Sequence, residues 1–490
     1  MNRWITFWAL VALLTFPMFN GGYLTAKAAE EDELTPAQQE AVKRAVQRYL
    51  EENQLGETRP QMEQRQKEMG GGGPSERRES LSDLNKPREL HGKYDSSMEG
   101  SGTLIYSRPF VASPKAILGG YSQFEYRNFN KGGPSTFDHH RFVPFIYADV
   151  SQNVKVATEI EIEHGIREGT ETEISLEFAT VDYLMHEAFN FRGGVVLLPV
   201  GKFNLLHDAP LRDITDRPFV DTYIIPTTLS ETGVGFYGTF YPTQLSQLNY
   251  EVYVTTGFNG YNDGSGCSYG SDLTMCTGLI TDGAGLKDAR QRKSNIGDGF
   301  DNNNGKAVVG RVAFSPILGV EVGGSGYFGA FDPNSKRPLS ITAVDWTIQR
   351  GPFEVIGEAA WAYVRDNSWT LTGMNTSMTS GTGSPLPQRM SGYYIQTNYH
   401  FLPSLFVKLA PNHFRPETST FTAVVRWEEA NTNKDNNNGI GQYQQLTLGL
   451  NFRPLEDTVF KVNYLYTPET NNGSQRIHNN GFVASVASYF

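Results

Sequence analysis

The sequence predicts an all-β protein: a transmembrane antiparallel β-barrel of about sixteen strands over residues 114–490, preceded by a short helical or disordered periplasmic segment. Three observations predict it. Runs of about ten residues alternate between apolar and polar side chains, the connections between them alternate between long and short, and the chain ends in the aromatic residue Phe490. A tilted strand of about ten residues is long enough to cross a hydrocarbon layer. Long connections at one end and short ones at the other are typical of transmembrane barrels.

The composition agrees with a barrel and disagrees with a helical membrane protein. Hydrophobic residues make up 39% of the 490 residues, aromatic residues make up 12%, and there are 50 glycines. A barrel needs apolar side chains only at alternate positions, with aromatic girdles at both membrane surfaces. After the first 28 residues there is no run of about 18 apolar residues, so a membrane-spanning helix is excluded there.

Residues 1–28 have the pattern of a signal peptide. Arg3 precedes an apolar stretch from Ile5 to Phe19, and Ala26-Lys27-Ala28 matches a cleavage site. An anchoring helix is the weaker interpretation, because the apolar stretch is short and Pro17 interrupts it. Cleavage leaves 40 basic and 53 acidic residues, a formal charge of −13. This acidic balance argues against nucleic acid as a partner.

Residues 29–113 are predicted to form a periplasmic segment with one short helix and a linker. Thr35, Pro36 and Gln38 match a capping box with proline at the first helical position. Residues 57–90 are polar and charged, which indicates a linker. An apolar stripe at helical spacing fits both a helix lying on the barrel base and a helix that joins three copies. The stripe consists of Ala41, Val42, Ala45, Val46, Tyr49 and Leu50.

From residue 114 onward, the period of two residues predicts sixteen strands. In one of them, Glu159, Glu161 and Glu163 share the polar face and are predicted to form an acidic wall of the lumen. These glutamates with His164 could also hold a metal, but the strand period alone explains them. His139 and His140 have no partner that the sequence indicates. The predicted strands are 114–128, 139–150, 153–164, 171–183, 187–200, 229–241, 247–258, 304–315, 318–330, 338–349, 352–365, 388–401, 420–430, 440–452, 456–467 and 477–490.

The long connection 201–228 is the predicted constriction of a pore. The run from Val195 to Val200 before it has the pattern of a membrane-facing strand. A polar connection of about 27 residues inside an ordered domain indicates a functional role. Between Lys202 and Glu231 three basic residues stand against five acidic ones, which predicts a weak cation preference. The predicted constriction residues are Lys202, His207, Asp208, Arg212, Asp213, Asp216, Arg217 and Asp221, and the two arginines could face Asp213 and Asp216 across the pore.

Several short segments together resemble a bacterial porin family that is grouped with the phosphate-selective porins O and P. They are His140-Arg141-Phe142-Val143, Glu159 to His164, Val195 to Lys202, Arg217-Pro218 and Ile224 to Thr228. The resemblance covers residues 115–260 best. It implies a homotrimeric sixteen-stranded channel in the outer membrane of a Gram-negative-type bacterium, surrounded by lipid, whose third external loop folds inward. The phosphate-binding members line their lumen with ladders of Arg and Lys, and this sequence shows no such ladder.

The remaining chemical signals are local. Cys267 and Cys276 are the only cysteines and lie close together in one long connection, which predicts a disulfide. Segments 298–305 and 435–439 are rich in Asp, Asn and Gly, but they lack the ligand order of a calcium loop and its closing Glu. We therefore expect neither a metal site nor a cofactor.

Three function classes compete, and the sequence favours a porin for small hydrophilic solutes or ions. A barrel enzyme would need a nucleophile with a histidine and an acid at the strand ends, and no G-x-S-x-G motif or comparable spacing is present. A structural or adhesive surface protein is the other alternative. Single-channel conductance steps in a planar bilayer distinguish the porin from both.

Overall fold

The computed structural model describes residues 116–131, 134–164, 173–262, 277–290, 303–365, 387–435, 440–468, 470–472, 475–477 and 479–490. The predicted signal peptide, the periplasmic segment 29–113 and the predicted disulfide between Cys267 and Cys276 lie outside these residues. So does most of the segment 298–305.

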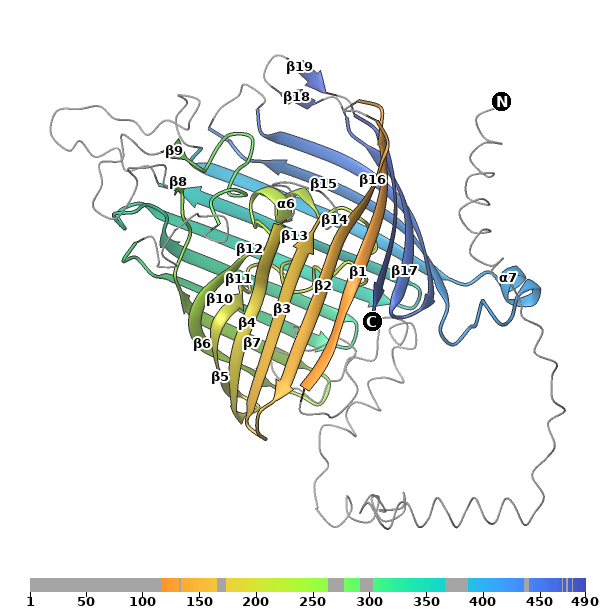
Figure 1. The fold of residues 1–490 in the computed structure, drawn as a ribbon, viewed down its shortest axis with the longest axis horizontal. Coiled ribbons are helices and arrows are strands. Elements are labelled where there is room, and N and C mark those ends of the chain that lie inside the picture. Colours follow the sequence, from red (N-terminus) through yellow and green to blue (C-terminus); the bar gives the residue numbers. More distant parts are fainter. Residues whose placement is uncertain are drawn as a thin grey trace, which may run out of the picture. The chain divides into compact units, whose positions relative to one another are not determined.

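Sixteen strands form one closed barrel, in which each strand pairs antiparallel with its neighbours and the first strand pairs with the last (Figure 1). The strands are β1 (Ala116–Phe129), β2 (Thr136–Asp149), β3 (Val154–Glu163), β4 (Glu173–His186), β5 (Phe189–Leu197), β6 (Ser230–Phe240), β7 (Gln247–Thr255), β10 (Ala307–Ile317), β11 (Val320–Ala330), β12 (Pro338–Arg350), β13 (Phe353–Val364), β14 (Arg389–Phe401), β15 (Thr420–Asn431), β16 (Gln442–Leu455), β17 (Thr458–Tyr466) and β20 (Gly481–Tyr489).

The predicted fold class is confirmed, and the sixteen strands lie where the period of two residues placed them. The long connections carry additional elements that this period did not predict. Two short hairpins lie there, β8 (Tyr261–Asn262) with β9 (Thr277–Gly278) and β18 (Thr470–Asn472) with β19 (Gln475–Ile477).

The outer surface of the barrel is apolar and the inner surface is polar. On β7, Val252 and Val254 are 42% and 48% exposed, whereas the alternate residues Glu251 and Tyr253 are buried. The other strands repeat this alternation with exposed valine, leucine, isoleucine and phenylalanine. An even-stranded closed barrel with an apolar exterior is the architecture of bacterial outer-membrane proteins, so the barrel wall faces lipid.

The last residue closes the seam between the two terminal strands. The backbone N–H of Phe490 donates to the carbonyl of Gly120 at 2.9 Å, and the N–H of Gly120 donates back at 3.2 Å. The Phe490 ring stacks on Phe142 of β2 with 5.6 Å between the ring centroids. The terminal aromatic residue thus covers the start of the seam on the outer face.

The connection 402–419 is the one long connection at the end of the barrel where the others are short. It contains helix α7 (Ser404–Leu409), whose Leu405 and Leu409 are exposed. Phe414 of this connection contacts Phe421 and Phe452 on the outer face, with centroid distances of 6.1 Å and 5.2 Å. Aromatic clusters of this kind are typical of the membrane interface. In the part of the chain that the structure describes, no helix is long and apolar enough to cross a membrane.

Candidate functional site

The connection between β5 and β6, residues 198–229, folds into the lumen and is here called L3. It contains helix α6 (Phe219–Tyr223), which is drawn within the ring of strands (Figure 1). Hydrogen bonds or ion pairs join L3 to side chains of eleven strands: β1, β3, β4, β11 to β17 and β20. Because these strands surround the barrel axis, only a loop inside the lumen can contact all of them.

The two ends of L3 are held together at Asn204. Its side-chain N–H groups donate to the carbonyls of Leu198 and Leu229 at 2.8 and 3.0 Å, and its Oδ1 accepts from the Leu229 N–H at 2.9 Å. Asn204 is fully buried, so all three bonds form away from bulk solvent. One side chain that both donates and accepts hydrogen bonds therefore joins the two ends of L3.

The apolar run from Val196 to Val200, which enters L3, does not face the membrane, contrary to the prediction. Strand β5 ends at Leu197, and Leu198 and Val200 are fully buried. Both belong to a hydrophobic cluster with Ile224 and Leu229 of L3. The run is apolar because it forms the core between L3 and the barrel wall, a surface that period and hydropathy cannot distinguish from lipid.

Residues 201–203 of L3 bind β11 and β13. The backbone N–H groups of Lys202 and Phe203 both donate to Glu358 Oε2 of β13, at 2.8 and 3.1 Å. Lys202 Nζ lies 2.8 Å from Glu321 Oε1 of β11. Gly201, with a φ of 71°, lets the chain turn here, because an added Cβ would lie 2.0 Å from Glu358 Oε1.

His207 and Asp208 hold the next part of L3 against β4 and β20. His207 Nε2 lies 3.0 Å from Glu177 Oε2, and both side chains are fully buried. Glu177 also accepts from Thr228 Oγ1 at 3.1 Å, so one carboxylate joins two distant points of the loop. Tyr489 of β20 donates its hydroxyl to Asp208 Oδ2 at 2.8 Å.

Asp213 and Asp216 are bound by the barrel wall on the side of β14 to β17 and β1. Asp213 accepts from Asn398 Nδ2 at 2.9 Å and lies 3.5 Å from the Arg453 guanidinium. Asp216 forms an ion pair with Arg127 at 2.6 Å. Burial raises the pKa of Asp216, but the Arg127 charge outweighs it and the pKa is lowered.

Arg212 and Arg217 are engaged by the backbone of L3 and by other strands, and not by the two aspartates that the sequence offered. Arg212 donates to the Thr215 carbonyl at 2.8 Å. Arg217 donates to the Thr227 carbonyl at 2.6 Å and lies 3.6 Å from Glu161 of β3. Burial, with the neighbouring arginine charges, lowers the pKa of Arg212 to about 9, so it remains charged at neutral pH.

Asp221 in α6 forms a carboxyl pair with Glu358. Burial raises the pKa of Asp221 well above its usual value, and the Glu358 charge and hydrogen bond raise it further. Glu358 already accepts the two backbone N–H groups of Lys202 and Phe203, which favours its ionised form. We therefore assign the proton of the pair to Asp221.

The three glutamates of β3 lie on the inner side of the strand. Glu159 and Glu161 are buried, and Glu163 is partly exposed near the end of β3. Arg141 of β2 binds two of them, with distances of 2.9 Å to Glu161 and 2.7 Å to Glu163. The acidic row thus contacts a base of the neighbouring strand and, through Arg217, the loop L3.

Sequence reasoning missed a group of bases that bind backbone carbonyls of L3. Arg426 of β15 donates to Asp216 at 3.0 Å, Arg453 of β16 to Pro210 at 2.6 Å, and Lys461 of β17 to Ala209 at 2.6 Å. Each occupies an inward position of a different strand, so no single segment displays them as a row. The alternation places each on the polar face, but it does not show that they meet one loop.

Acidic side chains exceed basic ones in the interior. Among the residues that the structure describes, fourteen aspartates and glutamates but only seven arginines and lysines are buried. Most of them lie on L3 or at inward positions of the strands.

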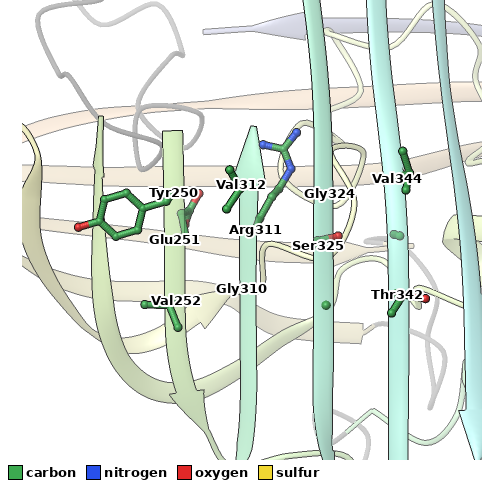
Figure 2. Close-up of a pocket in the computed structure, with 12 residues that line it drawn as sticks. Tyr250, Glu251, Val252, Gly310, Arg311, Val312, Gly324, Ser325, Thr342 and Val344 are labelled. Atoms are coloured by element: carbon green, nitrogen blue, oxygen red, sulfur yellow. The ribbon is translucent and has the colours of Figure 1, made fainter. Parts of the chain in front are cut away.

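A depression of about 570 Å³ lies on the wall at β7, β10, β11 and β12 (Figure 2), and Ser325 of its lining also accepts the Gly201 N–H of L3 at 2.9 Å. The depression forms where Gly310 and Gly324 have no side chain to fill the surface. The exposed Val252, Val312 and Val344 border it. Its lining is mostly apolar and contributes no group arranged for chemistry. We therefore assign it to the lipid-facing surface, and the candidate site remains L3.

Comparison with known proteins finds a relative in sequence and several similar solved structures. No protein-family model matches the sequence. A protein of Aquifex aeolicus (strain VF5), described as uncharacterized, is 28% identical over 371 residues, which cover 73% of this chain and 77% of that protein. Among solved structures, the outer membrane channel DcaP of Acinetobacter baumannii has a TM-score of 0.45 and 12% identity over 76% of this chain and 97% of that chain. An anion-selective porin from Comamonas acidovorans has a TM-score of 0.46 and 11% identity, with 76% and 99% covered.

Proposed function

We propose that the protein is an outer-membrane porin, through which small hydrophilic solutes and ions diffuse passively past a constriction formed by L3. The observation that carries the proposal is the position of L3. A loop fixed to eleven strands inside a closed, charged lumen narrows that lumen without needing to move. The proposal involves no catalytic step and no cofactor.

The excess of acidic side chains supports a weak cation preference. In a narrow lumen with low-dielectric walls, charges of one sign raise the local concentration of counter-ions and repel co-ions. The bases Arg426, Arg453 and Lys461 donate to carbonyls of L3, so part of the positive charge is engaged in holding the loop. The preference falls as salt screens these charges.

Single-channel recording in planar bilayers tests the proposal with the wild type and a deletion of residues 205–227. Both proteins are first checked for folding by the different migration of unheated and boiled samples on a detergent gel. The deletion should raise the conductance, and reversal potentials under a salt gradient should show a weaker cation preference. Folded wild-type protein that gives no conductance steps supports the surface-protein alternative, and an unchanged conductance after deletion refutes L3 as the constriction. Liposome swelling with sugars, amino acids and anions then identifies the solute class.

The proposal includes a homotrimer, for which the support is the resemblance of the sequence to trimeric porins. Chemical cross-linking in detergent should give a species of three chains. Deletion of residues 30–90 should leave conductance intact, because the predicted barrel begins after them. If that deletion converts the trimer to monomers, the helix predicted near residues 37–50 joins the subunits.

A further inference from the structure

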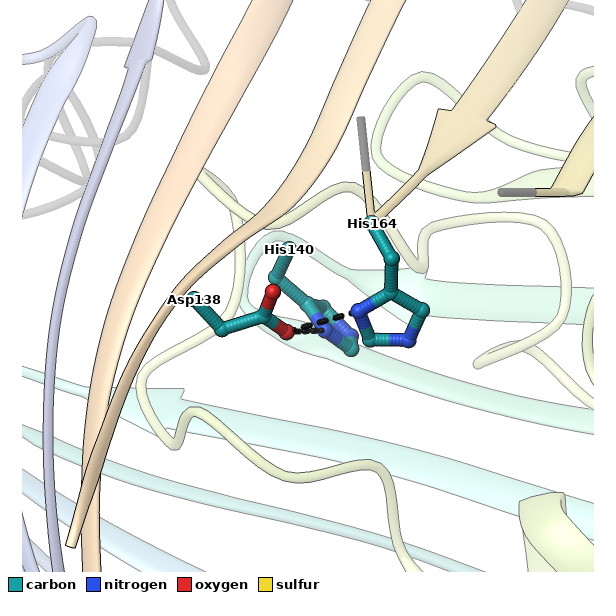
Figure 3. Close-up of side chains that lie close together, drawn as sticks. All are labelled: Asp138, His140 and His164. Carbon is teal, nitrogen blue, oxygen red and sulfur yellow. Dashed lines mark hydrogen bonds and ion pairs between the residues drawn. The ribbon is translucent and has the colours of Figure 1, made fainter. Parts of the chain in front are cut away.

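Asp138, His140 and His164 converge on one point near the end of the barrel that carries the long connections. Asp138 and His140 belong to β2, and His164 directly follows β3. His140 Nδ1 lies 3.2 Å from Asp138 Oδ2, and His164 Nδ1 lies 2.8 Å from the same oxygen (Figure 3). One ligand atom from each residue thus lies within 4.8 Å of the others.

A β-bulge turns His140 toward Asp138. The pairing of β1 with β2 shifts register between Gln123 and Phe124, and His140 is the residue left over on β2. Asp138 pairs with Glu125, which is buried inside the barrel. Directly paired residues of antiparallel strands lie on the same face, so Asp138 faces the lumen. The extra residue of a bulge redirects a side chain, and bulges are frequent next to functional sites.

The backbone of His164 is held in a conformation that few residues other than glycine adopt. Its φ is 54°, in the left-handed region. Its N–H donates to the His140 carbonyl at 3.2 Å, which fixes the chain as it leaves β3 beside β2. Two separate departures from regular strand geometry therefore bring the two imidazoles to one carboxylate.

We propose that Asp138, His140 and His164 bind a divalent transition-metal ion at the lumen wall, with Zn²⁺ as the ion to test. At metal–ligand bonds of about 2.0–2.2 Å, adjacent ligands of a tetrahedral ion lie about 3.4 Å apart. The observed separations of 3.2 and 2.8 Å need only a small expansion to accept the ion. Imidazole with carboxylate suits zinc, copper and nickel, whereas calcium and magnesium prefer oxygen ligands.

The site is accessible and has an open coordination position. The side chains of Asp138, His140 and His164 are 21%, 20% and 34% exposed, so an ion in the lumen can reach them. Three protein ligands leave the fourth tetrahedral position to water. A second group, Glu159 with Glu177 and His207, has similar spacing, but it is fully enclosed and its His207–Glu177 contact holds L3.

The nearest base on the same strand does not oppose a bound cation. Arg141 follows His140 directly, but its guanidinium lies 2.9 Å from Glu161 and 2.7 Å from Glu163. Its charge is therefore balanced by two carboxylates. The sequence indicated no partner for His140, because the bulge at His140 and the position of His164 beside it are not visible in the sequence.

Isothermal titration of the full protein in detergent with Zn²⁺, after removal of bound metal by EDTA, tests the proposal. We expect one ion per chain in the wild type. His140→Ala and His164→Ala should each weaken binding more than about tenfold, because the loss of an outer partner of a ligand already costs 10–100-fold. His139→Ala is the matched control: its ring stacks on Phe124 with a centroid distance of 4.5 Å and bonds Ser122. This variant should bind as the wild type does.

Co²⁺ absorption of the wild type gives a readout that needs no variant. A visible band of four-coordinate Co²⁺, displaced by one equivalent of Zn²⁺, supports the site even where a variant folds poorly. Absence of binding by the wild type overturns the proposal and leaves a hydrogen-bonded Asp–His–His group. Equal affinity in folded His140→Ala and His164→Ala proteins overturns it as well. Neither readout depends on conductance, so the result is separate from the proposed porin function.

Discussion

Arg127 of β1 and Asp216 of L3 form an ion pair with 2.6 Å between Nη2 and Oδ1, although 89 residues separate them in the chain. The two side chains are 26% and 24% exposed, so water screens them only partly. The pair fixes the middle of L3 to the strand that closes the barrel. A double-mutant cycle with Arg127→Gln and Asp216→Asn should give a coupling of about 0.5–1.5 kcal/mol in the free energy of unfolding by urea.

The pair Lys155–Asp149 is the control for this cycle, since its N–O distance is 2.5 Å but Asp149 is 50% exposed and contacts no part of L3 described above. Its coupling should be smaller, because exposed pairs contribute about 0.2–1 kcal/mol. A coupling for Arg127–Asp216 no larger than that of the control contradicts a role in seating L3.

Gly201→Ala should loosen the start of L3. The φ of 71° is unfavourable for alanine, at a cost of about 1–2 kcal/mol, and the new Cβ would displace the Glu358 carboxylate that binds two N–H groups of L3. We expect larger current fluctuations in single-channel records and a lower temperature for loss of the folded band on a gel. Gly283→Ala is the control, because its Cβ would have no atom within 4 Å. Quiet, wild-type currents in Gly201→Ala would show that this contact does not hold the loop.

The carboxyl pair in α6 predicts a dependence of L3 on pH. The pKa of Asp221 is raised above its unfolded value of 3.8 by burial and by Glu358. Its contribution is fully present below pH 3.8 and is lost as the pH rises through the folded pKa, at about 1.4 kcal/mol per pH unit in between. Current fluctuations from L3 should therefore increase with pH above 4. Asp221→Asn, whose amide donates without titrating, should reduce this increase.

Asp216→Asn serves as the comparison, because the contribution of Asp216 to holding L3 depends on pH in the opposite direction to that of Asp221. The pKa of Asp216 is lowered, so its contribution is present above the unfolded pKa of 3.8 and is lost as the pH falls through the folded pKa. Replacement of Asp216 by Asn should increase the current fluctuations from L3 at neutral pH and have its smallest effect at acidic pH. Identical pH profiles for the Asp221 and Asp216 variants would contradict the assignment of the proton to Asp221.

The strands can be predicted because their pattern lies within one segment of the sequence. The contacts that hold L3 against the barrel wall cannot, because they join residues far apart in the sequence. The alternation around Glu159, Glu161 and Glu163 follows from the pleat of one strand. The contact of Lys461 with Ala209 joins residues 252 positions apart, and no pattern within either segment indicates it. The burial of Val200 inside the barrel cannot be predicted from hydropathy, because the apolar core under L3 and the membrane select the same side chains.

The proposed metal site could not be predicted from the sequence either. Asp138 and His140 look like ordinary polar residues at the start of a strand, and His164 looks like the end of the next one. Only the bulge in β2 and the left-handed backbone of His164 bring the three together. Both are departures from the regular period on which sequence reasoning relies.

Glu163→Gln should weaken the cation preference of the channel. Glu163 lies at an inner position near the end of β3 with 19% of its side chain exposed, so its charge acts on ions in the lumen. A unit charge about 8 Å from an ion in water changes the ion's energy by about 0.5 kcal/mol, or roughly twofold in local concentration at low salt. Glu429→Gln is the control, because it removes the same charge from the other face of the wall. Glu429 lies on β15, where it accepts from Trp427, and it alternates with Glu428 and Ala430, which are buried on the inner face. Reversal potentials at low salt should move toward zero for Glu163→Gln and hardly change for Glu429→Gln. The difference should vanish in about 1 M salt, where the screening length is about 3 Å. Equal shifts for both variants would mean that the inner wall does not set the selectivity.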